Sequence, residues 1–124
     1  MNPRTIAAGV AIGRLAIGAA LTAKPASEAG AGWVGTEEAQ RPVTKLLFRS
    51  VGARDMALGL GTLGALRKGS PLRPWLLGAT LADVTDLLAT AGSGSAIPMK
   101  SRVSLVLLAG GAIVAQLAAS RTLD

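Results

Sequence analysis

Four apolar segments alternate with polar stretches along the chain, and each segment is long enough to cross a bilayer as a helix. We predict spans at about 5–23, 43–66, 75–91 and 103–120. A hydrocarbon core of about 30 Å needs about 20 apolar residues in a helix rising about 1.5 Å per residue. The pattern predicts an all-α polytopic membrane protein: a single domain, residues 1–124, forming a bundle of four transmembrane helices.

The first predicted span carries one charge, Arg14, near its centre. A cleaved signal peptide is the alternative, but a central arginine is not typical of a signal-peptide core, so we expect the segment to be retained. Gly9 and Gly13 have GxxxG spacing, which predicts close approach of a neighbouring helix. Gly110 and Gly111 in the fourth span also predict close approach of a neighbouring helix.

The segment 24–41 is polar and punctuated by proline and glycine, which is typical of a surface loop. Thr36 followed by Glu37 predicts a helix start, with the hydroxyl as cap and the carboxylate opposing the helix dipole. Trp33 is expected in the headgroup layer. A loop of this length is either an ordinary connection or a lid over a site.

Composition agrees with a membrane protein. Hydrophobic residues make up 50% of the chain and charged residues only 16%, whereas a soluble domain has about 25% charged residues. There is no cysteine and no histidine, so we expect no disulfide, no metal site and no cofactor. The glycines form no phosphate-binding loop. The net charge of +6 comes from scattered basic residues, which argues against nucleic-acid binding and favours membrane-flanking charges.

Charged residues near the middle of the predicted spans define the candidate site. A charge at the bilayer centre costs about 2.5–3.5 kcal/mol on insertion scales, so such residues face a bundle interior. Midpoints of four spans lie at one depth, and we expect the charges there to meet. The candidate ligand-binding or proton-carrying residues are Arg14, Arg54, Asp55, Asp83 and Asp86.

Chemistry assigns different roles to the two residue types. The arginines, always protonated, are candidate anion or carbonyl binders, and the aspartates are candidate acids, bases or proton carriers. Catalytic residues are not identified. With Arg49 included, the charges inside the spans balance, although Arg49 itself is expected near the membrane edge. The alternative is that Arg–Asp pairs only fix helix packing. Threonines and Gln116 are expected to form ordinary interhelical hydrogen bonds.

The positive-inside rule barely distinguishes the two membrane orientations, because five basic residues are expected on each side of the membrane. The dense basic turn at 67–73 favours both termini in the cytoplasm. The near tie is also compatible with a dual-topology dimer. The expected location is the bacterial plasma (inner) membrane, with the lipid bilayer as partner and a homodimer or larger membrane complex as a possibility.

The stretch Gly52-Ala-Arg-Asp-Met-Ala-Leu-Gly59, followed by Asp83 in the next span, resembles a family of small uncharacterised four-helix membrane proteins of actinobacteria. The Arg14-Leu-x-x-Gly18 pattern is distantly similar to DoxX-type membrane proteins, which are linked to quinone-side redox partners. The resemblance implies the fold and a bacterial membrane. Small multidrug transporters are similar in size, but they carry a glutamate where this chain has Arg14, which argues against cation export.

From these patterns we expect a midplane site that binds a small polar or amphiphilic ligand. Two alternatives stay open: a structural or accessory subunit, and a proton-coupled small transporter acting as a dimer. The sequence leaves open whether the protein is an enzyme.

Overall fold

The computed structural model describes residues 2–123, and this part of the chain is helical with no strand. Four long helices correspond to the four predicted spans, and two short helices and a 3-10 turn lie between them. The elements are α1 (Pro3–Ala23), α2 (Glu28–Val34), α3 (Thr36–Ala39), α4 (Pro42–Lys68), α5 (Arg73–Ala91), η1 (Gly94–Ala96) and α6 (Met99–Thr122).

Local signals set the helix boundaries. Asn2 caps α1 by accepting a 2.8 Å hydrogen bond from the backbone N–H of Arg4, and prolines occupy the first turns of α1, α4 and α5. Proline suits these positions because its missing N–H would have no helical partner there. α4 ends at Gly69, whose φ of 67° is a left-handed conformation that glycine adopts without strain.

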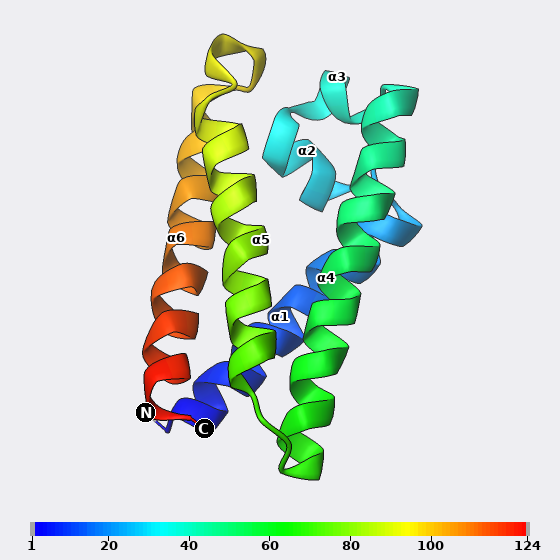
Figure 1. The fold of residues 1–124 in the computed structure, drawn as a ribbon. Helices are drawn as coiled ribbons and strands as arrows, with labels where there is room; N and C mark the ends of the chain where they lie inside the picture. Colours follow the sequence, from blue (N-terminus) through cyan, green and yellow to red (C-terminus); the bar gives the residue numbers. More distant parts are fainter. Residues whose placement is uncertain (1, 124) are drawn as a thin grey trace.

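The long helices form two pairs, α1 with α4 and α5 with α6. α1 runs obliquely across the molecule from the end of α6 to the far side of α4 (Figure 1). The start of α1, the end of α6 and the α4–α5 connection lie at one end of the molecule. A cluster of apolar side chains closes that end, formed around Ala7, Ala65, Leu72, Leu76 and Ala119.

Glycines bring α1 and α4 into close contact, but on α1 the glycine involved, Gly18, is not one of the expected pair. A Cβ on Gly18 would lie 2.7 Å from the carbonyl oxygen of Gly52, and one on Gly59 would lie 2.8 Å from that of Ala11. By contrast, a Cβ on Gly9 or Gly13 would meet nothing within 4 Å among the described atoms. The predicted packing role of the Gly9–Gly13 spacing is therefore wrong.

The fourth predicted span gives a similar result. Nothing described lies within 4 Å of a Cβ added at Gly110 or Gly111, so these glycines do not bring another helix close. Gly111 instead borders a cavity.

The segment between α1 and α4 is folded rather than a polar surface loop. Its helices α2 and α3 pack onto Leu21 and Phe48, with Ala39 fully buried. Trp33 stacks on Phe48 with ring centroids 5.4 Å apart, so its ring packs within the fold and not only at a headgroup layer. α3 does begin at Thr36, but Gly35 is its N-cap and no side chain caps it.

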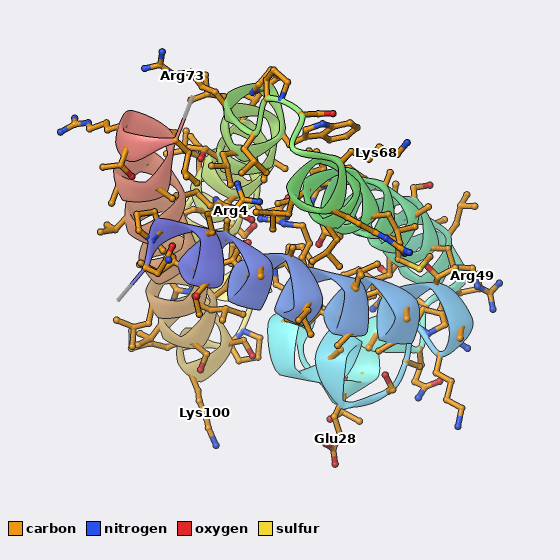
Figure 2. All side chains as sticks on the ribbon, turned by 90° about the horizontal axis from the view of Figure 1, so that it is seen from below. Arg4, Glu28, Arg49, Lys68, Arg73 and Lys100 are labelled. Atoms are coloured by element: carbon orange, nitrogen blue, oxygen red, sulfur yellow. The ribbon has the colours of Figure 1, made fainter. Side chains whose placement is uncertain are left out.

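Several polar side chains are buried, and many large apolar side chains are exposed. The buried set includes Arg14, Asp55, Asp83, Gln116 and three threonines, whereas leucine, isoleucine and valine side chains on all four long helices are exposed. Charged side chains such as Arg49, Lys68 and Lys100 extend away from the interior (Figure 2). Two helices, α1 and α6, are long and apolar enough to cross a membrane. α4 and α5 are not among the helices apolar enough to cross a membrane by this measure, and they carry four of the five candidate site residues.

Candidate functional site

All five predicted charges form one network, in which Arg14, Asp55 and Asp83 are buried and Arg54 and Asp86 are partly buried. α1 supplies Arg14, α4 supplies Arg54 and Asp55, and α5 supplies Asp83 and Asp86. They meet because each helix turns its polar or small-residue face inward: Gly52, Asp55, Gly59 and Thr62 are buried together on α4, and Thr80 and Asp83 on α5. On each helix these residues recur at intervals of three or four, which places them on one face.

Arg14 lies at the centre of the network. Its Nη1 donates to Oδ1 of Asp55 at 3.0 Å, and its Nη2 donates to Oδ2 of Asp83 at 2.5 Å. All three side chains are nearly inaccessible, with 6% of Arg14 and 11% of each aspartate side chain exposed. One guanidinium therefore links α1 to both α4 and α5 through buried, charge-assisted hydrogen bonds.

Arg54 extends the network in the other direction. Its Nε and Nη2 donate to Oδ1 of Asp55 at 3.2 and 3.0 Å. Its Nη1 and Nη2 also reach both carboxylate oxygens of Asp86, at 3.1 and 2.6 Å. The fork geometry matches the carboxylate and fixes both side chains. The charges alternate in sign along the line Asp83, Arg14, Asp55, Arg54 and Asp86.

Gln116 of α6 completes the network. Its Oε1 accepts from Nη2 of Arg14 at 3.1 Å, and its Nε2 donates to Oδ2 of Asp83 at 2.9 Å. Its side chain is among the most deeply buried in the protein, at 2% exposure. Sequence reasoning expected only an ordinary interhelical hydrogen bond, although a single strongly polar residue in an otherwise apolar segment was the available signal. All four long helices thus contribute to one cluster.

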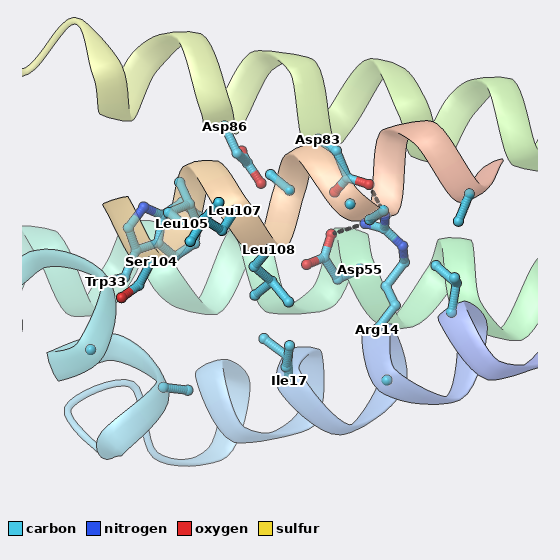
Figure 3. Close-up of a pocket in the computed structure, with 18 residues that line it drawn as sticks. Arg14, Ile17, Trp33, Asp55, Asp83, Asp86, Ser104, Leu105, Leu107 and Leu108 are labelled. Atoms are coloured by element: carbon cyan, nitrogen blue, oxygen red, sulfur yellow. Dashed lines mark hydrogen bonds and ion pairs between the residues drawn. The ribbon is translucent and has the colours of Figure 1, made fainter. Parts of the chain in front are cut away.

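A cavity of about 570 Å³ adjoins the network. It lies between α1 and α6, with α2 bordering one end, and its lining is mostly apolar. Arg14, Asp55 and Asp83 lie toward one end of this cavity, and Trp33, Ser104 and Leu105 toward the other (Figure 3). The lining residues are Val10, Gly13, Arg14, Ile17, Ala29, Gly32, Trp33, Asp55, Asp83, Asp86, Ser104, Leu105, Leu107, Leu108, Ala109, Gly111, Ala112 and Ala115.

α2 is tied to the cavity by Trp33. The indole Nε1 donates to Oγ1 of Thr90 on α5 at 2.9 Å, and the ring stacks on Phe48 of α4. The helix therefore holds a defined position at the end of the cavity. Of the two interpretations of the segment 24–41, a cover over a site fits the position of α2 better than a simple connection does.

Most of the arginine donors bond to the carboxylates of the network. Arg14 Nη1 and Nη2 and all three nitrogens of Arg54 donate within the network. The remaining nitrogen, Nε of Arg14, is fully buried without a partner among the described residues. Each Nη atom carries two N–H groups, so one N–H on Nη1 of Arg14 and one on Nη1 of Arg54 have no partner among the described residues. The Arg54 side chain is 32% exposed, so this arginine keeps a donor for the anion or carbonyl binding expected from its chemistry.

Arg49 lies outside the cluster. Its Nε donates to the carbonyl oxygen of Thr22 at 3.2 Å, and its side chain is exposed (Figure 2). The interior therefore contains two arginines and three aspartates. With every aspartate ionised, the cluster has a net charge of −1, and the expected balance of charges within the spans does not hold inside the fold.

Hydrolytic or metal-dependent chemistry has little support in this geometry. Within residues 2–123, no group of three or more acidic side chains is arranged to hold a metal ion. The hydroxyls of Thr62 and Thr80 donate to backbone carbonyls one turn earlier in their own helices. The arrangement suits binding of a ligand with an apolar body and a polar head.

Comparison of the chain with protein-family models, with curated proteins and with solved structures gives no match. The function is therefore inferred from the site itself.

Proposed function

We propose that this chain is a small integral membrane protein of four spans whose cavity between α1 and α6 binds a small amphiphilic molecule. One observation carries the proposal: an apolar cavity of about 570 Å³ lies against a buried Arg/Asp cluster. Cavities of about 300–1,000 Å³ with mostly apolar linings and a few polar groups are typical small-molecule sites.

The distribution of residues supports the membrane assignment. An apolar helix in the core of a soluble protein is mostly buried, but only 28% of the apolar window of α1 and 22% of that of α6 are buried here. Exposed leucines continue onto the helices with charges, among them Leu60 of α4 and Leu81 of α5, which are 61% and 68% exposed. Contiguous exposed apolar surface marks a membrane or protein interface.

The orientation we propose has both chain ends on the cytoplasmic side of a bacterial inner membrane. Support comes from the basic turn that contains Arg67, Lys68 and Arg73, since short cytoplasmic loops are enriched in such residues. The two helix ends nearest the chain termini lie at the same end of the molecule as this turn (Figure 1).

The bordering helices support entry of the ligand from the side. Leu107 and Leu108 of α6 line the cavity and are 72% and 59% exposed, so its rim is apolar. In a bilayer, this rim would face acyl chains. An amphiphile dissolved in the membrane would then reach the charged end without passing through water.

Glycine substitutions test the cavity. Gly13 and Gly111 line it, and a Cβ at either position meets nothing within 4 Å, so Gly13→Leu and Gly111→Leu place new side chains at or in the cavity without a backbone clash. Gly9→Leu and Gly110→Leu are matched controls, equally unobstructed but outside the lining. Binding of single-chain amphiphiles to protein in nanodiscs should weaken at least about tenfold in the first pair only. Equal binding by all four variants contradicts a cavity site.

Cysteine labelling tests the spans, because the natural chain has no cysteine. In intact cells, a membrane-impermeant maleimide should label Ser93→Cys, in the α5–α6 connection, from outside. It should reach Ser70→Cys, in the α4–α5 connection, only after the membrane is opened. Leu81→Cys, exposed on α5, should resist the reagent under both conditions, and rapid labelling there contradicts the four-span arrangement.

A purely structural role is the second candidate, favoured by the interhelical ion pairs of Arg14 with Asp55 and Asp83 and of Arg54 with Asp86. Amphiphile binding that is insensitive to the cavity variants, together with strong destabilisation by loss of Arg14, would support it. The resemblance to DoxX-type proteins stays a prediction.

A further inference from the structure

The charged end of the cavity is acidic. Its lining includes three aspartates and one arginine, and the second arginine of the network, Arg54, does not line it. The whole cluster has a net charge of −1 when its aspartates are ionised. A negative charge next to an apolar cavity is costly, and a cation entering the cavity would offset it.

Two carboxylate oxygens are available to such a cation. Among the described residues, no hydrogen bond reaches Oδ1 of Asp83 or Oδ2 of Asp55, because the network uses the other oxygen of each. The fully buried side-chain atoms without a partner are Arg14 Nε and Ser27 Oγ. The two oxygens are not fully buried, so a water-sized group can reach them. Each belongs to a cavity-lining residue that is 8% exposed overall.

The hydrogen-bonding pattern selects the head group. A carboxylate oxygen accepts hydrogen bonds, whereas both Nη atoms of Arg14 already donate to the network and Arg54 does not line the cavity. An anionic or acceptor-only head would therefore meet the negative charge of the aspartates with few donors to offset it. A protonated primary amine offers three donors and a positive charge. Charge-assisted hydrogen bonds of this kind are about twice as strong as neutral ones.

We propose that the occupant of the cavity is a protonated long-chain primary amine, with its ammonium at Asp55 and Asp83 and its apolar chain extending toward Trp33. The proposal rests on the proposed function and adds the chemical class of the ligand. The positions of the two ends in Figure 3 set the direction of the chain. A cavity of about 570 Å³ holds one small molecule, so one chain occupies it.

Fluorescence of Trp33 provides the test. The chain has two tryptophans, and Trp75→Phe leaves Trp33 as the one emitter. Protein in phosphatidylcholine nanodiscs is titrated with 12-bromododecylamine, 12-bromododecanol and 12-bromododecanoic acid, whose terminal bromine quenches a nearby indole. Quenching that Gly13→Leu or Gly111→Leu removes is assigned to the cavity, and the remainder to bromine in the surrounding lipid.

The head-group series on the intact protein decides the proposal. The amine should bind about ten- to a hundredfold more tightly than the alcohol, and the carboxylate should bind most weakly. If the alcohol or the carboxylate binds as tightly as the amine, the amine proposal is overturned and the amphiphile cavity stands. If no probe gives cavity-dependent quenching, the proposed function itself fails.

A variant with one aspartate neutralised tests independently whether the charge of the cluster sets the preference for an amine. Asp83→Asn brings the net charge of the cluster to zero and should remove the preference for the amine over the alcohol, whereas Glu37→Gln, an exposed acid on α3, should retain it. A retained preference in Asp83→Asn overturns the proposal. If this variant does not fold, the head-group series still gives the answer.

The lipid composition identifies the source of the amine. In nanodiscs that contain phosphatidylethanolamine, a higher apparent Kd for 12-bromododecylamine means that the lipid head group competes for the site. An unchanged Kd points to a free long-chain amine. Both results support recognition of an amine.

Discussion

Arg14 of α1 and Asp83 of α5 are joined by a 2.5 Å hydrogen bond between Nη2 and Oδ2, although the two helices share little backbone contact. Both residues are 8% exposed. α1 packs mainly on α4 and α5 mainly on α6, so this ion pair connects the two helix pairs through the interior.

The ion pair between Arg14 and Asp83 predicts that Arg14→Ala strongly lowers the free energy of unfolding. Removal of the guanidinium leaves two buried carboxylates short of a donor, and loss of one partner from a buried pair costs about 3–5 kcal/mol. We expect a fall of that size in the free energy of unfolding, measured by titration with a denaturing detergent. Arg49→Ala is the control and should cost less than about 1 kcal/mol, since Arg49 is exposed and bonds one backbone carbonyl.

A double variant separates the cost of unpaired charges from the value of the pair. Arg14→Met with Asp83→Leu removes both charges and keeps similar volumes, and such exchanges are often neutral or stabilising. The double variant should therefore be more stable than Arg14→Ala. If it is as unstable as the single variant, the ion pair itself contributes most of the stability.

The contact between Gly18 and Gly52 predicts a steric effect. A Cβ at Gly52 would lie 2.5 Å from the carbonyl oxygen of Gly18, so Gly52→Ala forces α1 and α4 apart and should cost about 1–3 kcal/mol. Gly9→Ala meets no neighbour within 4 Å and should be neutral or stabilise by up to about 1 kcal/mol through higher helix propensity. The same unfolding titration checks both. A larger loss for Gly9→Ala would show that GxxxG spacing governs packing after all.

Gln116 should contribute measurably to stability. Gln116→Leu keeps the approximate shape but removes a donor to Asp83 and an acceptor for Arg14, both nearly inaccessible to water. Unsatisfied buried groups cost about 1–3 kcal/mol each, so we expect a loss in that range. Gln40→Leu, at an exposed position after α3, is the matched control and should change stability little. No difference between the two variants contradicts a role for Gln116 in the network.

Trp33 should hold α2 in place. Trp33→Phe keeps an aromatic ring beside Phe48 but loses the 2.9 Å hydrogen bond to Thr90. Because a neutral hydrogen bond contributes about 0.5–1.5 kcal/mol, the open form of the segment should become about two- to tenfold more populated. Cleavage after Glu28 and Glu38 by a glutamate-specific protease should accelerate by the same factor, since cleavage follows the population of the open form. Trp75→Phe should leave the rate unchanged.

Much of the fold was predictable from local pattern. The four long helices lie where the apolar segments are, because hydrophobicity, prolines in first turns and Gly69 after α4 act within a few residues. The inward faces of α4 and α5 were also predictable from residues spaced three and four apart. The all-helical prediction is confirmed for residues 2–123, and two of the four long helices are apolar enough to cross a membrane.

Contacts between helices were less predictable. On α1, glycine spacing identified Gly9 and Gly13 as a packing surface, but Gly18 makes the close approach to Gly52 of α4. A glycine only permits contact, and the crossing of α1 over α4 decides which glycine is used. α2 was missed because its short, glycine-rich sequence has little helix propensity of its own, and packing of Trp33 and its neighbours onto Phe48 stabilises it.

The sequence by itself determined the four long helices and the charged residues of the cluster, because hydropathy and periodicity are properties of contiguous residues. Only the tertiary structure decided that Gln116 is included, which aspartate each arginine pairs with, and that a cavity remains between α1 and α6. These features depend on side chains up to 102 positions apart. Their partners are set by helix crossing and packing, which no local pattern encodes.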